Sequence, residues 1–371
     1  MKTYFSILYF SLMLLSYPVL ADLSIDQGAS WLYISEQSVR CANQDSERCR
    51  LYSWISLGDE SYRIGNYNEA LERYENSLAL NPDSNDQAII NNHIGDVFFK
   101  FGWYDEALNK YEEVQAIRYL DRSSPPLSGY ENQKDQGAAL IALERYEEAL
   151  SIFIQILEKD SQDSVALHGK GLALYKLGRL SESLASFNIS SQINSTDSLM
   201  WKDKGNVLFD LNSYLGALNS YEKALQLSPS LADAWYGKAN ALVKLKRYEE
   251  ALASFERCLE IDPSNIAAWN NKGATLVEMR RYADALTCYD ESIKKAPNYA
   301  TPLANKAEAL LFTGRYLEAI NYSNKSLEID SNSAFAWALN GKALAALGRY
   351  DKALISLNNS LEIDSSKTDT W

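Results

Sequence analysis

The chain has 371 residues and a formal net charge of −13, from 49 acidic and 36 basic side chains. This excess of negative charge argues against nucleic acid as a partner, because the phosphate backbone is also negative. Hydrophobic residues make up 46% of the chain, so it can bury a core and is not expected to be disordered throughout. A chain of this length is expected to form either two domains or a repeat array. Its small number of Pro residues (8) and large number of Tyr residues (24) favour packed helices.

The N-terminal segment has the pattern of a secretory signal peptide. Lys2 precedes an almost uninterrupted apolar run over residues 4–15, and Val19 and Ala21 stand at the −3 and −1 positions of a cut before Asp22. This pattern predicts a signal peptide over residues 1–21 and a secreted or otherwise extracytoplasmic protein. The alternative is membrane attachment if residues 4–21 are not cleaved, although the apolar run is short for a membrane span.

A small residue recurs at a fixed spacing along most of the chain. The last seven occurrences are 34 residues apart, and the first two intervals contain three and eight extra residues. We number each repeat unit so that this residue is position 8. The position 8 residues are Gly58, Gly95, Gly137, Gly171, Gly205, Ala239, Gly273, Ala307 and Gly341.

Further columns follow the same period and predict a helical hairpin in each unit. In residues 232–265, Trp235, Ala239 and Leu242 lie on one face of a first helix. Tyr248 at position 17 and Phe255 at position 24 belong to the apolar face of a second helix. Four units carry Pro at position 32, where we expect it to end the second helix.

These columns resemble the tetratricopeptide repeat (TPR) pattern W-x2-L-G-x2-Y…A-x3-F…P, which residues 201–229, 235–263 and 269–297 match best. The resemblance covers residues 51–367. The chain is similar to long prokaryotic or archaeal TPR arrays with an N-terminal signal peptide. The resemblance implies an all-α fold, a right-handed superhelical solenoid of about nine 34-residue antiparallel helix hairpins. Position 7, usually Leu in the family, is Lys in five units, and we expect each Lys stem to lie over apolar neighbours while its charge reaches water.

In chain order, the expected parts are a signal peptide (1–21), a lead-in helix within residues 22–50, units one and two (51–121), a Pro-containing linker (122–129), units three to nine (130–367) and the start of an incomplete tenth unit (368–371). Trp371 falls on position 4 of that tenth unit. The second helix of unit nine is therefore expected to leave an apolar face bare. We expect that the chain can self-associate through this face.

Motifs for catalysis and metal binding are missing from the sequence. His93 and His168 lie in no H-E-x-x-H setting, and neither a phosphate-binding loop nor a G-x-S-x-G motif occurs. We therefore expect no enzyme, no cofactor and no metal site. The four cysteines are Cys41, Cys49, Cys258 and Cys288. The first two are a disulfide candidate in an oxidising compartment, and the last two are expected to be buried thiols.

The TPR resemblance implies a concave groove lined by the first helices, mainly through positions 2, 5, 9, 12 and 13. In units four to seven, the candidate groove residues are His168, Leu172, Tyr175, Lys202, Asn206, Phe209, Tyr236, Asn240 and Asn270. The expected function is a non-catalytic protein–protein interaction scaffold that binds other proteins or peptides. The alternative is the recruiting module of a longer extracytoplasmic enzyme, for example a transferase, or of an assembly factor whose catalytic part is absent from this chain.

Overall fold

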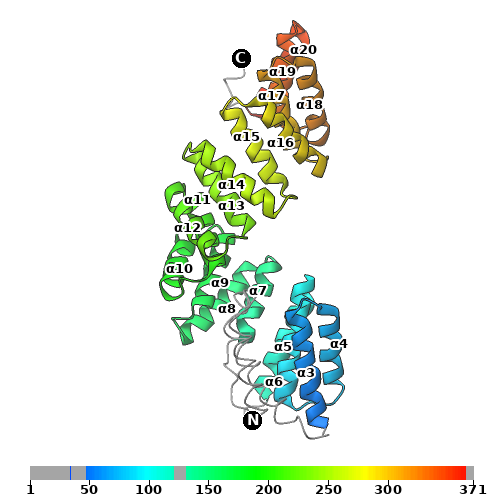
Figure 1. The fold of residues 1–371 in the computed structure, drawn as a ribbon, viewed down its shortest axis with the longest axis vertical. Coiled ribbons are helices and arrows are strands. Elements are labelled where there is room, and N and C mark those ends of the chain that lie inside the picture. Colours follow the sequence, from blue (N-terminus) through cyan, green and yellow to red (C-terminus); the bar gives the residue numbers. More distant parts are fainter. Residues whose placement is uncertain (1–33, 35–46, 121–130, 365–371) are drawn as a thin grey trace, which may run out of the picture. The chain divides into compact units, whose positions relative to one another are not determined.

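The computed structural model describes residues 34, 47–120 and 131–364, and within these ranges it is all-helical (Figure 1). This confirms the predicted all-α hairpin array. The expected signal peptide, most of the lead-in segment, the linker and residues 368–371 lie outside the described ranges. Ile34 is helical and packs in the core of the first two hairpins. None of the described helices is both long enough and apolar enough to cross a membrane.

The described residues form eighteen helices that pair as nine hairpins. The hairpins are α3 (Glu47–Arg63) with α4 (Tyr67–Leu78), α5 (Ser84–Phe101) with α6 (Tyr104–Leu120), α7 (Glu131–Ala142) with α8 (Tyr146–Lys159), α9 (Ser164–Lys176) with α10 (Leu180–Ile193), α11 (Ser198–Asp210) with α12 (Tyr214–Leu227), α13 (Ala232–Lys244) with α14 (Tyr248–Ile261), α15 (Ile266–Glu278) with α16 (Tyr282–Lys295), α17 (Ala300–Phe312) with α18 (Tyr316–Ile329), and α19 (Ala334–Ala346) with α20 (Tyr350–Ile363).

The helices fall into two compact units, one within residues 1–195 (α3–α10) and one within residues 196–371 (α11–α20). In each unit the second helix of a hairpin packs on the first helix of the next, as α8 does on α9 and α12 on α13. Helices α6 and α7 also pack together on either side of the linker. Asn132 Nδ2 on α7 donates to the Tyr111 carbonyl on α6 at 2.7 Å.

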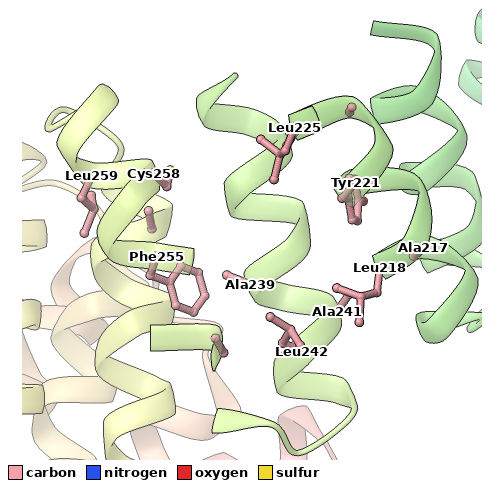
Figure 2. Packing of buried hydrophobic residues seen from close by; sticks show 14 residues of the cluster. Ala217, Leu218, Tyr221, Leu225, Ala239, Ala241, Leu242, Phe255, Cys258 and Leu259 are labelled. Carbon is pink, nitrogen blue, oxygen red and sulfur yellow. The ribbon is translucent and has the colours of Figure 1, made fainter. Parts of the chain in front are cut away.

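The small residue at position 8 lets the large residue at position 24 lie against the backbone of its own first helix. A Cβ added at Gly205 would lie 2.6 Å from Cε1 of Tyr221, and one added at Gly273 would lie 2.6 Å from Cε1 of Tyr289. Figure 2 shows Phe255 directed from α14 toward Ala239 on α13, both fully buried. Closely packed interiors leave no room for a larger side chain at such contacts.

Each hairpin turns through a residue in the left-handed conformation at position 15. Sequence analysis missed this column because four of its nine members are not Gly. The Gly members have φ of 73–80° and the others φ of 59–60°. They are Gly65, Gly102, Glu144, Gly178, Asn212, Lys246, Arg280, Gly314 and Gly348.

Second helices end at the same position with and without Pro at position 32. Helices α8, α10 and α18 end at the same position as α12 and α14, although Ser occupies position 32 in their units. Where the next first helix carries Trp at position 4, as α13, α15 and α19 do, the Trp side chain holds this turn. Its indole nitrogen donates to the carbonyl at position 32, from Trp235 to Pro229 at 2.9 Å and from Trp337 to Ser331 at 3.0 Å. A carbonyl acceptor does not require Pro.

The cysteines in the described ranges have different states. Cys258 and Cys288 are free and buried, as predicted, and burial raises the pKa of each thiol to about 11. Cys49, at the start of α3, is disulfide-bonded. Cys41, its expected partner, lies outside the described residues, so their pairing stays a prediction.

The left-handed turn residue gives a matched test of the fold. Arg280→Gly should raise the free energy of unfolding by about 1 kcal/mol, because only a residue with a Cβ is strained at φ 59°. Gly314→Ala should lower it by a similar amount, since the added methyl meets no atom within 4 Å and only the backbone cost remains. Urea unfolding followed by circular dichroism measures both. A less stable Arg280→Gly variant would contradict this account.

Candidate functional site

The first helices form a closely packed row on one side of each unit. Consecutive first helices touch one another, as α11 does α13, α15 does α17 and α17 does α19. Among the described helices, consecutive second helices do not approach each other as closely. We call the side formed by the first helices the inner side. This is the side on which the sequence places the candidate groove.

Four asparagines and a tyrosine are hydrogen-bonded across three first helices of the second unit. Asn271 Nδ2 on α15 donates to Tyr236 Oη and to Asn240 Oδ1 on α13, both at 3.0 Å. Asn270 Nδ2 donates to Asn271 Oδ1 at 3.1 Å, and Asn305 Nδ2 on α17 donates to Asn270 Oδ1 at 2.9 Å. We call these five residues the asparagine network. Their bonds fix the orientation of amide groups along the inner side.

The network contains three of the predicted groove residues, Tyr236, Asn240 and Asn270. Asn270 is buried, whereas the other two are half-buried. Asn271 and Asn305 occupy position 6, which was not among the expected groove positions, so the candidate set omitted them. The available signal was the Asn at position 6 of two successive units.

The predicted residues on α11 are bound within their own hairpin and do not belong to the network. Asn206 accepts a 2.8 Å hydrogen bond from the Tyr221 hydroxyl, and Lys202 Nζ lies 3.0 Å from Asp203 Oδ1. The Phe209 ring stands edge-on to Tyr214, with centroids 5.4 Å apart. Asn206 and Asn240 are both half-buried and bonded, so neither is a freely exposed groove side chain.

His168, Leu172 and Tyr175 lie on α9 in the first unit, and all three are half-buried. The His168 ring packs against Phe187, with centroids 5.7 Å apart. The candidate set is therefore divided between the two units, and a continuous groove through all nine residues stays a prediction.

Position 7 lysines bridge neighbouring hairpins away from the network. Lys238 Nζ lies 5.4 Å from the centroid of the Trp235 ring and 3.0 Å from Glu222 on the preceding second helix. Lys272 lies in the same way over Trp269 and pairs with Glu256. For Lys238 and Lys272 this confirms the expectation that the stem covers apolar neighbours while the charge stays near water, whereas Lys306 is buried and binds Asp290 and the Tyr322 hydroxyl.

Buried tyrosines at position 24 reach the residue at position 9 of their own first helix. The hydroxyls of Tyr74, Tyr111 and Tyr221 donate to Asp59, Asp96 and Asn206 at 2.8, 2.9 and 2.8 Å, respectively. Asp96 is buried there, and burial raises the pKa of its carboxyl group to about 6. A phenol from the core thus reaches the inner side in three hairpins.

Tyr289 is the exception among these tyrosines. Position 9 of its hairpin is Ala274, which offers no side-chain acceptor. The Tyr289 hydroxyl is buried and has no hydrogen-bond partner in the described part of the chain. A buried polar group without a partner costs free energy, so this hydroxyl does not serve the stability of the isolated fold.

Comparison with protein families identifies the repeat. Models described as "Tetratricopeptide repeat" match residues 55–121, 134–195, 232–265 and 264–332, and one described as "TPR repeat" matches residues 205–246. The matches lie in both units and coincide with the hairpins. The chain is a tetratricopeptide repeat protein. Proteins built from TPR hairpins act in general as protein–protein interaction scaffolds, and their fold is typically non-catalytic.

Solved TPR structures resemble parts of the chain. The structure titled "Functional Characterization of Pseudomonas Aeruginosa pilF" is 17% identical, covers 57% of this chain and 97% of its own, and has a TM-score of 0.50. YrrB, titled "a TPR protein with an unusual peptide-binding site", is 26% identical over 50% of this chain and 95% of its own, with a TM-score of 0.42. MamA from Desulfovibrio magneticus RS-1 is 18% identical over 46% of this chain and 97% of its own, with a TM-score of 0.43. No curated protein matches the sequence.

Within the described ranges, no three His, Cys, Asp or Glu side chains are grouped so that they could hold a metal ion. In the acidic pairs that begin α8 and α14, both carboxylates are exposed and the second one is paired with an arginine. Arg145 Nε lies 2.7 Å from Glu148, and this bond lowers the pKa of the Glu148 carboxyl group. Arg247 and Glu250 repeat the arrangement. A paired, solvated carboxylate at a helix start suits the helix dipole.

The tyrosines at position 24 give a matched test of this description. Tyr221→Phe should lower the free energy of unfolding by about 0.5–1.5 kcal/mol, because Asn206 loses its hydrogen bond. Tyr289→Phe should leave it unchanged or raise it by about 1 kcal/mol, because the change removes a buried hydroxyl that has no partner. Denaturant unfolding of both variants measures the difference. Equal losses of stability would show that the Tyr289 hydroxyl is bonded.

Proposed function

We propose that the row of first helices in this TPR protein binds extended segments of partner proteins, and that the chain is a non-catalytic scaffold. The asparagine network is the observation that carries this proposal. An amide side chain can donate to and accept from a polypeptide backbone, and the network already holds its amides in place. A preorganised site loses less conformational entropy when it binds. Asn305 keeps its amide oxygen and one amide hydrogen without a partner in the described residues.

We also propose an extracytoplasmic location. Two observations support it, namely the signal-peptide pattern of residues 1–21 and the disulfide bond of Cys49. Disulfides persist mainly in oxidising compartments. The groove would then meet its partners outside the cytoplasm.

A photo-reactive amino acid placed at chosen sites of the exported chain tests both proposals. Lys244 and Glu278 are exposed at position 13 of α13 and α15, and should give crosslinks to a partner. Glu249 and Ala283 are exposed at the start of α14 and α16, and serve as matched controls that should not. Crosslinks mainly from the control sites would contradict a groove on the first helices. The N-terminal residue of the same purified material should be Asp22, and retention of Met1 would contradict cleavage.

We further propose that the open face of α20 is a second interface, which another first helix of the same kind covers. Leu354 on α20 is 51% exposed, whereas Leu252 at the same position of α14 is 7% exposed under the next hairpin. Position 21 is buried or half-buried in each preceding hairpin, and a second copy of the chain carries helices that fit the exposed Leu354.

Sedimentation analysis tests the α20 interface. The chain should self-associate in the micromolar range, and Leu354→Lys should weaken this association at least about ten-fold, because a charge would be buried in the contact. Leu317→Lys is the matched control, since Leu317 is 62% exposed at the start of α18 and should not affect association. A wild-type chain that stays monomeric at about 100 μM, or equal effects of the two variants, would overturn the proposal.

A further inference from the structure

Three ionisable side chains are buried together on the inner side of the first unit. Asp59 on α3 and Asp96 on α5 both occupy position 9, and His93 on α5 occupies position 6. Asp59, His93 and Asp96 are 3%, 5% and 7% exposed, respectively. A charge that is moved out of water costs free energy unless an opposite charge or hydrogen bonds compensate it. The stability of this part of the fold therefore depends on which of the three carry a charge.

The contacts of these residues join the first two hairpins. His93 Nδ1 lies 3.0 Å from Asp59 Oδ1, so the two side chains meet between α5 and α3. The hydroxyl of Tyr74 on α4 donates to the same Asp59 oxygen at 2.8 Å, and the centroids of the Tyr74 and His93 rings are 5.3 Å apart. Tyr111 on α6 donates to Asp96 at 2.9 Å, and Asp96 is one helical turn from His93. We call Asp59, His93 and Asp96 the Asp–His cluster.

The second unit has a neutral counterpart at the same repeat positions. Asn240 at position 9 of α13 accepts a 3.0 Å hydrogen bond from Asn271 at position 6 of α15. Asp59 and His93 stand at positions 9 and 6 of two successive first helices in the same way. The repeat can therefore join two first helices through these positions with uncharged side chains. Only the first unit has groups there whose charge changes with pH in the range where imidazole titrates.

The pKa of Asp96 shows how the cluster responds to its surroundings. Burial is the main cause that raises this pKa to about 6, and Asp59 acts in the same direction. His93, Tyr111 and the exposed Lys100 lower it. The remaining ionisable groups that interact electrostatically with the cluster or with Tyr111 are Tyr62 on α3, Tyr74 on α4 and Asp135 on α7.

We propose that the Asp–His cluster is a pH-sensitive contact, which holds the first two hairpins together in mildly acidic solution and weakens at neutral pH. When the cluster holds an additional proton, at most one of its carboxyl groups is charged without a facing positive charge. When that proton is lost, Asp59 and Asp96 are both charged in a buried space that they share with one imidazole, and their repulsion opposes the contact between α3 and α5. The effect acts on the stacking of the first unit and requires no bound segment.

The direction of the effect follows from the two states of Asp96. The pKa of its carboxyl group is about 6 in the folded chain, compared with an ordinary value of 3.8. A group whose pKa is higher in the folded chain stabilises the fold below its unfolded pKa, and this stabilisation is lost as the pH rises through its folded pKa. From about pH 5 to about pH 7.5, the loss corresponds to about a ten-fold change in the equilibrium between the closed and the open contact.

Hydrogen exchange of the full chain, measured by mass spectrometry, tests the proposal. Protection factors, which correct for the effect of pH on the exchange chemistry, should be about ten-fold higher in α3 and α5 at about pH 5 than at about pH 7.5. Helix α13, which carries the neutral Asn240, should change by less than about three-fold. Equal protection of α3 and α5 at the two pH values would overturn the proposal.

Two matched variants separate the cluster from the general effect of removing an acid. Asp96→Asn should abolish most of the pH dependence, and it keeps an acceptor for Tyr111, just as Asn206 accepts the hydroxyl of Tyr221. Asp105→Asn removes an exposed carboxylate from α6 of the same hairpin and should leave the pH dependence as it is in the wild type. An equal pH dependence in the two variants would show that the cluster is not its source.

Carboxyl 13C NMR of aspartate-labelled protein measures the titration itself, even where a variant alters stability. The Asp96 signal, identified by its loss in Asp96→Asn, should titrate at about pH 6. His93→Asn should move this midpoint to higher pH and Asp59→Asn should move it to lower pH, because His93 lowers the pKa of Asp96 and Asp59 raises it. A wild-type midpoint at about pH 4, the ordinary range of Asp, or shifts in the same direction in both variants, would contradict the cluster.

Discussion

The contact between position 8 and position 24 sets the geometry of eight of the nine described hairpins. A Gly or Ala on the first helix allows a large side chain of the second helix to lie on its backbone, as Tyr221 lies on Gly205. The contact fixes the distance between the two helices, and the next hairpin stacks on the same ring, since a Cβ at Gly237 would also meet Tyr221 at 2.5 Å. One ring therefore joins two hairpins, which is how a repeat without a closed core of its own gains stability.

The same ring connects the core with the inner side. The far end of the ring reaches position 9 of the first helix. Whether position 24 is Tyr or Phe therefore decides which hydrogen-bond partner the side chain at position 9 has. Asn206 faces Tyr221 and accepts its hydroxyl. Asn240 faces Phe255, which offers no donor, and it bonds instead to Asn271 on the next first helix. The asparagine network thus begins where the phenol is absent.

Sequence reasoning could predict the hairpins because each column serves one contact that repeats every 34 residues. It could not identify position 15, since Glu144, Lys246 and Gly348 share a backbone angle and no side-chain chemistry. It named Tyr236, Asn240 and Asn270 from their positions. It also named Asn206, whose true partner, Tyr221, lies fifteen residues away on the second helix. Whether an asparagine is already hydrogen-bonded within its own hairpin depends on the residue at a different repeat position. A comparison of one repeat position at a time does not reveal such pairs.

Departures from the repeat are therefore informative. A stack selected only for stability would place Phe opposite Ala274, because the ring fills the same space without a buried polar group. The chain has Tyr289 there, and it has Glu308 at the equivalent position of the next first helix, where no phenol of its own hairpin can reach. Elsewhere donor and acceptor pair inside one hairpin, as Tyr111 and Asp96 do. At Tyr289 the donor has no acceptor in the described residues, so the fold leaves this buried hydroxyl unsatisfied.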